Sequence, residues 1–254
     1  MKGKVAFITG GANGIGRASA KALLELGVNV AILDINEQAL NEAVEELKSI
    51  GPEIMPIKAD LAMVEELDGV FNSAVKKFGR VDYLINSAAC LVGSYDFLKE
   101  SREVWDRVIQ INLTMPMFLM QRFLRHVVER GGGGRVVMVT SAAAFRAVKN
   151  RPAYAASKAG VTSLVRIAAA QMGAYDINVN AVAPGTTSTH GTTVARNVDK
   201  EVLSRAVSSG PSENFFKRVS EPEDVASAVA YLCHPGSRQI TGQTIHVSAG
   251  TITP

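Results

Sequence analysis

The chain has 254 residues, of which 47% are hydrophobic and 20% are charged, and its formal net charge is +3. This length suits one α/β domain with a large core, and the composition excludes a disordered chain. The basic residues are dispersed, which argues against binding to nucleic acid or to an anionic membrane. Cys90 and Cys233 lie far apart in the sequence, so we expect neither a disulfide scaffold nor a metal site.

The N-terminal region carries no targeting signal that we can identify. The apolar stretch over residues 5–8 is too short for the core of a signal peptide, and no later run has the length of a membrane span. We therefore expect a cytoplasmic protein in a reducing environment.

Short apolar runs alternate with longer amphipathic segments along the chain. The expected strands are residues 5–9, 28–33, 54–58, 83–86, 136–140, 178–183 and 244–247. The expected helices are residues 18–26, 37–50, 64–78, 104–129, 154–172 and 222–232. This alternation predicts a single domain over residues 1–254, with a doubly wound parallel sheet and helices on both faces, as in a Rossmann-like fold. The polar stretch 186–215 interrupts the alternation and suits a lid over a substrate site.

A glycine-rich turn over residues 9–16 follows the first strand and opens into a helix. Glycine permits a tight turn and a close backbone approach, so the N–H groups at the helix N-terminus can meet a pyrophosphate. The position of the turn therefore predicts a nucleotide site that includes Gly10, Asn13, Gly14, Ile15 and Gly16.

Asp34 closes the second strand, eighteen residues after Gly16, and is followed by Ile35. A carboxylate at this place can accept hydrogen bonds from the ribose hydroxyls of a bound dinucleotide. The alternative is a helix cap, because Asn36 and a helix come next. A carboxylate repels a 2′-phosphate, and Arg17 is the only nearby cation, so the sequence favours NAD over NADP.

Tyr154 and Lys158 lie four residues apart, with Ser141 thirteen positions before the tyrosine. On a helix this spacing puts the ammonium and the phenol on one face, where the positive charge stabilises a phenolate that can accept a proton. The alternatives are a solvated helix face for the pair, a surface position for the lysine and a turn cap for Ser141.

Together, the glycine turn, Ser141 and the Tyr154-x-x-x-Lys158 motif resemble the short-chain dehydrogenase/reductase family over essentially the whole chain. Further matches are Asp60, the segment 86–89, Asn112, the segment 184–185 and the segment 240–242. The resemblance implies that Asp60 and Leu61 contact the adenine and that the backbone from Asn86 to Ala88 lines the cofactor. It also implies that residues 184–189 hold the nicotinamide carboxamide, with Pro184, Gly185, Thr187 and Thr189 among the contacts.

Two positions depart from the family pattern. Asn86-Ser87-Ala88-Ala89 stands where the family usually has Asn-Asn-Ala-Gly, and Thr187 replaces a usual valine or isoleucine. The extra methyl of Ala89 narrows the space expected beside the nicotinamide. These departures concern the fit of substrate and nicotinamide rather than the class of enzyme.

The resemblance also implies catalytic roles. Tyr154 takes the hydroxyl proton, Ser141 hydrogen-bonds the substrate oxygen, Lys158 binds the nicotinamide ribose, and Asn112 holds a water that links the lysine to solvent. Pro116 follows Asn112 by four residues and has no N–H to donate to its carbonyl, which predicts a kink. We hypothesise that this frees the carbonyl for the water; an ordinary packing kink is the alternative.

We therefore expect an NAD-dependent enzyme that oxidises a secondary alcohol or diol. The segment 185–197, with residues 150–151, is weakly similar to dehydrogenases of aromatic cis-dihydrodiols such as those of the benzoate and p-cumate pathways. The first alternative is an NADPH-dependent ketone or 3-oxoacyl carrier-protein reductase, which conflicts with Asp34. The second is a nucleotide-binding regulator without chemistry. The resemblance further implies a homotetramer.

Overall fold

The computed structural model describes residues 1–94, 96–196 and 198–253. Residue 197 of the predicted lid and residue 254 of the predicted domain lie outside these ranges. Parallel strands form one seven-stranded sheet in the order β3-β2-β1-β4-β5-β6-β7. The strands are β1 (Val5–Thr9), β2 (Asn29–Asp34), β3 (Ile54–Lys58), β4 (Tyr83–Asn86), β5 (Gly134–Val139), β6 (Ile177–Pro184) and β7 (Thr244–Val247). The strand order reverses between β1 and β4, and a crevice for ligands opens at such a switch point.

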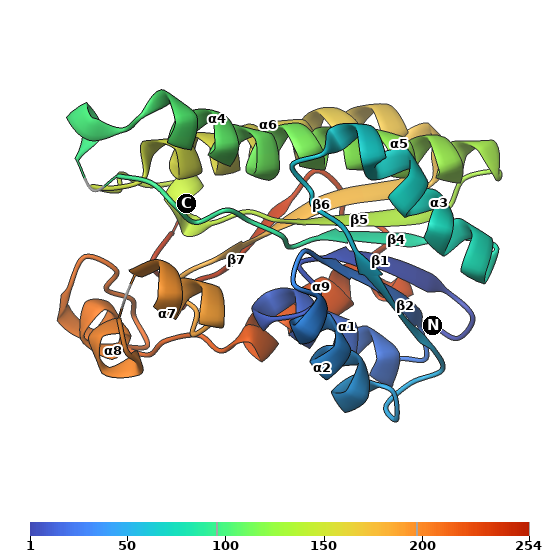
Figure 1. Cartoon of the computed structure of the whole chain (residues 1–254), viewed down its shortest axis with the longest axis horizontal. Helices are drawn as coiled ribbons and strands as arrows, with labels where there is room; N and C mark the ends of the chain where they lie inside the picture. Colours follow the sequence, from blue (N-terminus) through green and yellow to red (C-terminus); the bar gives the residue numbers. More distant parts are fainter. Residues whose placement is uncertain (95, 197, 254) are drawn as a thin grey trace.

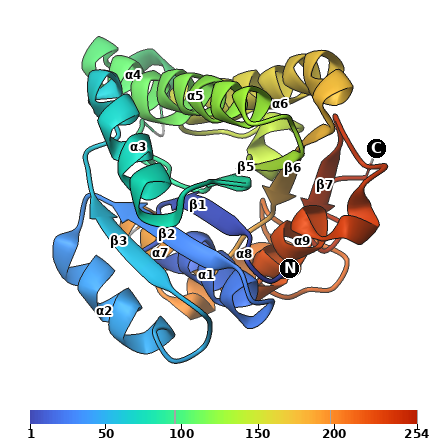
Figure 2. The ribbon, with the colours of Figure 1, turned by 90° about the vertical axis from the view of Figure 1, so that its right-hand side faces the viewer.

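Helices cover both faces of this sheet (Figures 1 and 2). One face carries α1 (Gly14–Glu25), α2 (Glu37–Leu47) and α9 (Pro222–Cys233). The other carries α3 (Leu67–Phe78), α4 (Arg102–Ile109), α5 (Met115–Glu129) and α6 (Pro152–Met172). The doubly wound, Rossmann-like fold predicted from the alternation is thus confirmed.

The core consists of two apolar layers, one on each side of the sheet. Along β1, Val5 and Phe7 pack into one layer, whereas Ala6 and Ile8 pack into the other. Successive side chains of a strand point to opposite faces, so a strand covered on both sides must be apolar throughout. The uninterrupted apolar runs in the sequence have this cause.

The largest departure from the predicted elements lies in the segment expected as one helix over residues 104–129. A π-helical turn, Gln110–Thr114, separates α4 from α5 there. Pro116 lacks the N–H that would close an α-helical bond to the Asn112 carbonyl, so the local register widens just before the proline. A π-helical turn thus stands at the point where the sequence predicted a kink.

Smaller differences have local causes. Helix α1 begins at Gly14 rather than at residue 18, because the glycine turn leads directly into it. Helix α6 begins at Pro152, two residues before Tyr154, as suits a proline in the first helical turn. Two short helices, α7 (His190–Arg196) and α8 (Lys200–Ser209), occupy the predicted lid segment (Figure 1). None of the helices in the described ranges combines the length and apolar character needed to cross a membrane.

Candidate active site

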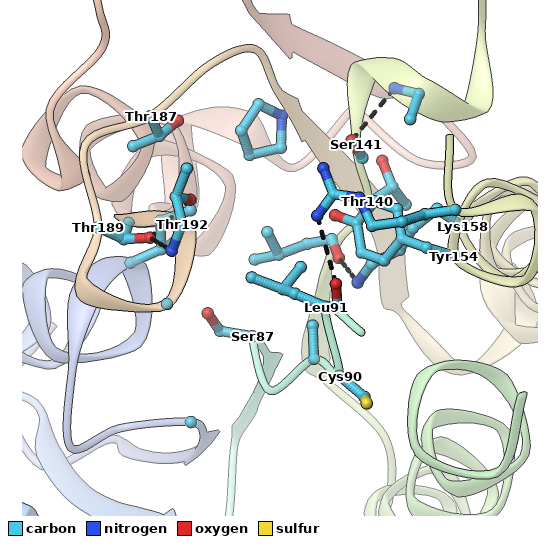
Figure 3. Close-up of a pocket in the computed structure, with 18 of the residues that line it drawn as sticks. Ser87, Cys90, Leu91, Thr140, Ser141, Tyr154, Lys158, Thr187, Thr189 and Thr192 are labelled. Atoms are coloured by element: carbon cyan, nitrogen blue, oxygen red, sulfur yellow. Dashed lines mark hydrogen bonds between the residues drawn. The ribbon is translucent and has the colours of Figure 1, made fainter. Parts of the chain in front are cut away.

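A cavity of about 1450 Å³ collects residues from the β1–α1 turn, from the ends of several strands, from α6 and from the segment after β6. Most of the predicted site residues line it: Gly10, Asn13, Ile15, Asp34, Ile35, Asp60, Leu61, Ala88, Ser141, Tyr154, Lys158, Pro184, Gly185, Thr187 and Thr189. Figure 3 shows Ser141, Tyr154 and Lys158 on one side of this cavity, opposite Thr187 and Thr189. The fold therefore brings the two halves of the predicted site together.

Four predicted residues do not line the cavity, and three of them, Gly16, Gly14 and Asn86, shape the turn and the strand ends around it. A Cβ atom on Gly16 would lie 2.1 Å from the Gly10 carbonyl oxygen, so only glycine allows the turn to close against α1. Gly14 has a φ of 52°, and a Cβ there would lie 3.2 Å from the side chain of Thr189. Asn86 is buried and accepts a 3.0 Å hydrogen bond from the Thr9 hydroxyl, which ties the ends of β1 and β4 together.

The N-terminus of α1 opens at the cavity. Asn13 precedes the helix in an extended conformation, its side chain makes no capping hydrogen bond within the described residues, and the first turn of the helix has no acidic residue. The first N–H groups of a helix lack partners within the helix, and with the helix dipole they favour an anion. The turn therefore fits the pyrophosphate of a dinucleotide.

Asp34 occupies the cavity wall at the end of β2. Its carboxylate accepts hydrogen bonds from the backbone N–H groups of Ala12, at 3.4 Å, and Asn36, at 3.2 Å. The cap of α2 is Asn36, whose side chain accepts from the N–H of Ala39 at 3.1 Å. The alternative that Asp34 is itself the helix cap is therefore wrong.

Arg17, the one cation expected near Asp34, is directed elsewhere. It forms an ion pair with Glu46 of α2 and is not among the residues that line the cavity. Asp60 also faces the cavity, and its side chain accepts a 2.9 Å bond from the N–H of Ala62. The predicted adenosine end of the site is thus acidic.

Lys158 is only 2% exposed. Its Nζ atom donates a 2.8 Å hydrogen bond to the carbonyl oxygen of Val139 and lies 5.8 Å from the centre of the Tyr154 ring. Burial disfavours the charged form and lowers the pKa of Lys158 to about 8, so the side chain remains mainly protonated at neutral pH. A surface position for this lysine, and with it a solvated face for the pair, is therefore excluded.

Ser141 lies two residues beyond the end of β5 and lines the cavity. Its Oγ atom accepts a 3.1 Å hydrogen bond from the N–H of Ala143, which caps the short helical turn Ala142–Ala144 (Figure 3). A hydroxyl that accepts one bond still has its own proton to donate. The capping role and a role toward the substrate are therefore compatible in one side chain.

Asn112 is fully buried in the π-helical turn and does not line the cavity. Its Oδ1 atom accepts from the N–H of Cys90 at 2.7 Å, and its Nδ2 atom donates to the carbonyl oxygen of Cys90 at 2.9 Å. This pair of bonds holds the segment after β4, where residues 87–91 form part of the cavity wall. The side chain thus positions a loop, and water binding by the Asn112 carbonyl remains a prediction.

Four cations line the cavity in addition to Lys158 and have no assigned role in the motif-based prediction: Arg107, Arg146, Lys149 and Arg151. Of these, Arg151 lies next to Tyr154: its guanidinium carbon is 5.6 Å from the centre of the Tyr154 ring. The sequence feature that could have pointed to Arg151 is its position three residues before Tyr154, next to the proline that begins the helix.

Comparisons with known proteins find similar sequences and similar structures. Residues 10–251 match the family described as enoyl-(acyl carrier protein) reductase. The short chain dehydrogenase/reductase astE of Aspergillus oryzae is 30% identical, over 98% of this chain and 95% of its own length. Among solved structures, a variant of actinorhodin polyketide ketoreductase with NADPH has a TM-score of 0.90 at 29% identity, covering 98% of this chain and 97% of that chain. Carveol dehydrogenase from Mycobacterium avium in complex with NAD has a TM-score of 0.89 at 28% identity, with 99% and 98% covered.

Proposed function

Because the chain belongs to the short-chain dehydrogenase/reductase family, an oxidoreductase family, we propose that it is an NAD-dependent dehydrogenase that converts a secondary alcohol or diol to a carbonyl compound. The observation that carries this proposal is that Ser141, Tyr154 and Lys158 line the same cavity as Asp34. The residues proposed to transfer the proton and the residue proposed to bind the dinucleotide therefore line one cavity.

The residues present fit a nicotinamide dinucleotide. The N–H groups at the start of α1 would meet the pyrophosphate, and the Asp34 carboxylate would accept from the adenosine ribose hydroxyls. The NAD form is supported by Asp34 and by the pairing of Arg17 with Glu46, which leaves that cation committed to α2. When bound, NAD supplies the hydride acceptor.

The chain's own part is to hold the substrate oxygen and take its proton. Tyr154, as a phenolate stabilised by the nearby Lys158 ammonium, would accept the hydroxyl proton. The Ser141 hydroxyl would donate a hydrogen bond to the substrate oxygen and so stabilise charge on it. Asn112 would support the site by holding the Cys90 backbone and by presenting its carbonyl to a water next to the lysine.

A second candidate is an NADPH-dependent ketone or 3-oxoacyl carrier-protein reductase. The similarity to a polyketide ketoreductase with NADPH favours it. A 2′-phosphate beside Asp34 would meet like charge, which opposes it. The complete set of Ser141, Tyr154 and Lys158 speaks against a regulator without chemistry, because binding alone needs no proton acceptor.

The activity and the choice of cofactor are tested together. We would measure kcat/KM for a panel of secondary alcohols, sugars and aromatic cis-dihydrodiols with NAD and with NADP. We expect turnover with NAD and a preference for it of about 100-fold or more, the scale of a full charge repulsion near a protein surface. A preference for NADP would favour the reductase, and no turnover with either cofactor would favour the regulator.

The proposal extends to assembly as a homotetramer. The outer side chains of α4, α5 and α6 include three large apolar residues: Trp105, 39% exposed, Phe118, 46% exposed, and Ile167, 54% exposed. Apolar side chains grouped on neighbouring helices favour burial against another subunit. Light scattering after size-exclusion chromatography should give four times the monomer mass, and a monomer would contradict this part.

A further inference from the structure

Arg151 has an unusual backbone conformation at the edge of the active-site cavity. Its φ is 51° and its ψ is 64°, the left-handed region that residues other than glycine rarely adopt. The following residue is Pro152, whose ring further restricts the residue before it. Such a conformation persists only where surrounding contacts impose it, and it is frequent at functional sites.

The contacts come from the segment after β4. The N–H of Arg151 donates to the carbonyl oxygen of Ser94 at 2.7 Å, and its Nη1 atom donates to the carbonyl oxygen of Leu91 at 3.3 Å. Between these two, Gly93 has a φ of 148°, and a Cβ there would lie 2.9 Å from the Arg151 Cγ atom. The loop therefore fixes the direction of the arginine side chain as well as its backbone.

The fixed guanidinium lines the cavity, with its carbon 5.6 Å from the centre of the Tyr154 ring. Within the described residues Arg151 has no ion pair with a carboxylate, and the one hydrogen bond of its guanidinium goes to Leu91. Arg146, also on the wall, is already engaged with Pro211 at 2.7 Å and Ser212 at 3.4 Å. Arg151 is therefore the cation next to Tyr154 that still has guanidinium N–H groups to offer.

The charges around the cavity divide into two ends. Among its described lining residues the carboxylates are Asp34, at the end of β2, and Asp60, just after β3. Three of the lining cations, Arg146, Lys149 and Arg151, belong instead to the segment between β5 and α6 that leads to Tyr154. A partly buried cation without a counter-charge is costly, and a bound anion would relieve that cost. The predicted substrate end is thus suited to a negative group.

We propose that Arg151 binds a carboxylate of the substrate, so that the enzyme acts on a hydroxy acid whose carbinol lies at Tyr154. This rests on the proposed function and names its substrate class. The planar guanidinium matches a carboxylate in shape and charge, and its rigid attachment to the loop would orient the molecule for proton transfer. Arg151 is then a substrate-specificity residue.

The test compares substrates that differ in charge alone. Isomers of hydroxycyclohexanecarboxylate and the matching carboxamides, with cyclohexanol as a neutral reference, are assayed with NAD. We expect at least one acid to exceed its amide in kcat/KM by about 10- to 100-fold, as for loss of a charged hydrogen bond. Equal values for every acid and its amide in the wild-type enzyme would overturn the proposal.

Two variants locate the effect. In Arg151→Gln, and to a lesser degree in Gly93→Ala, the ratio of acid to amide should fall toward one. Arg205→Gln, which removes an exposed arginine outside the cavity, should keep the wild-type ratio. An unchanged ratio in Arg151→Gln would overturn the proposal, as would an equal loss with the acid and with cyclohexanol, which would indicate a role in proton transfer instead. Thermal unfolding confirms that each variant is folded.

A binding measurement separates this proposal from the proposed function. Calorimetric titration of cyclohexanecarboxylate and cyclohexanecarboxamide into the protein with NADH needs no turnover. We expect the acid to bind about 10-fold or more tightly than the amide, and Arg151→Gln to lose the difference. That result without turnover of any alcohol would contradict only the proposed function. Turnover of cyclohexanol without a preference for acids would contradict only the carboxylate site.

Discussion

The Nζ atom of Lys158 lies 5.8 Å from the centre of the Tyr154 ring while it donates a hydrogen bond to the Val139 carbonyl oxygen at the end of β5. This arrangement fixes the ammonium between the sheet and the phenol, out of contact with bulk water. A mobile surface lysine would give the phenol little electrostatic help, because water screens its charge. Burial thus strengthens the electrostatic effect of the ammonium on the phenol, and it also raises the free energy of the charged lysine.

The cost should be visible in the stability of the protein. Lys158 has a pKa near 10.5 when unfolded and about 8 when folded, because burial disfavours its charge. Between these values the unfolded state binds more protons, so the free energy of unfolding rises with pH. From pH ~7 to ~10, wild type should gain about 2 kcal/mol more than Lys158→Met, which lacks the titration. Urea unfolding at several pH values measures this, and parallel curves for the two proteins would contradict it.

Removal of the Ser141 hydroxyl should lower kcat strongly and lower the free energy of unfolding only slightly. Ser141→Ala loses the donor to the substrate oxygen, for which we expect a decrease in kcat of about 100- to 1000-fold. It also loses the bond from the Ala143 N–H, which should cost about 1 kcal/mol. Ser141→Thr keeps the hydroxyl and serves as the control. A Ser141→Ala enzyme with near wild-type kcat would remove this residue from the mechanism.

Asp34 should control the choice between NAD and NADP. Asp34→Asn keeps the shape of the side chain and removes its charge, so the preference for NAD should fall by about 10-fold or more. Glu46→Gln, which releases Arg17 from its ion pair but leaves Asp34 in place, should change the preference less. Steady-state kinetics with both cofactors decide the matter, and an unaltered preference in Asp34→Asn would show that another feature selects the cofactor.

Pro116 should influence proton transfer through the Asn112 carbonyl. Pro116→Ala restores an N–H that can bond this carbonyl and compete with the predicted water, so kcat should decrease by several-fold and its solvent isotope effect should change. Met120→Leu, at a buried position of the same helix, controls for altered packing. Unchanged proton-transfer kinetics in Pro116→Ala would leave the proline as an ordinary packing kink.

The fold and most of the site were predictable because their signals are local. Apolar runs such as that of β1 mark strands covered on both faces, and the glycine turn and the Tyr154–Lys158 pair were expected near each other and do line one cavity. Asp34 could be expected at the cavity because it ends a strand, β2, and ligand crevices open beyond the carboxyl ends of such strands.

Other features depend on contacts between distant segments. The pair of hydrogen bonds between the Asn112 side chain and the Cys90 backbone joins residues 22 positions apart, and no spacing rule indicates it. Arg151 owes its direction to Leu91, Gly93 and Ser94, which lie about one strand and two helices earlier in the chain. The π-helical turn follows from Pro116, but its extent depends on packing against neighbouring helices.

The most direct measurement is the initial rate of NADH formation from the alcohol panel, by wild type and by Tyr154→Phe. We expect the wild-type enzyme to reduce NAD with at least one secondary alcohol, and Tyr154→Phe, which keeps the ring and lacks only the proton acceptor, to be slower by about 100- to 10,000-fold. NADH binding and thermal stability should be nearly the same in both proteins. Equal rates in the two, or no reduction of NAD by wild type with any alcohol, would contradict a dehydrogenase built on Tyr154 and Lys158.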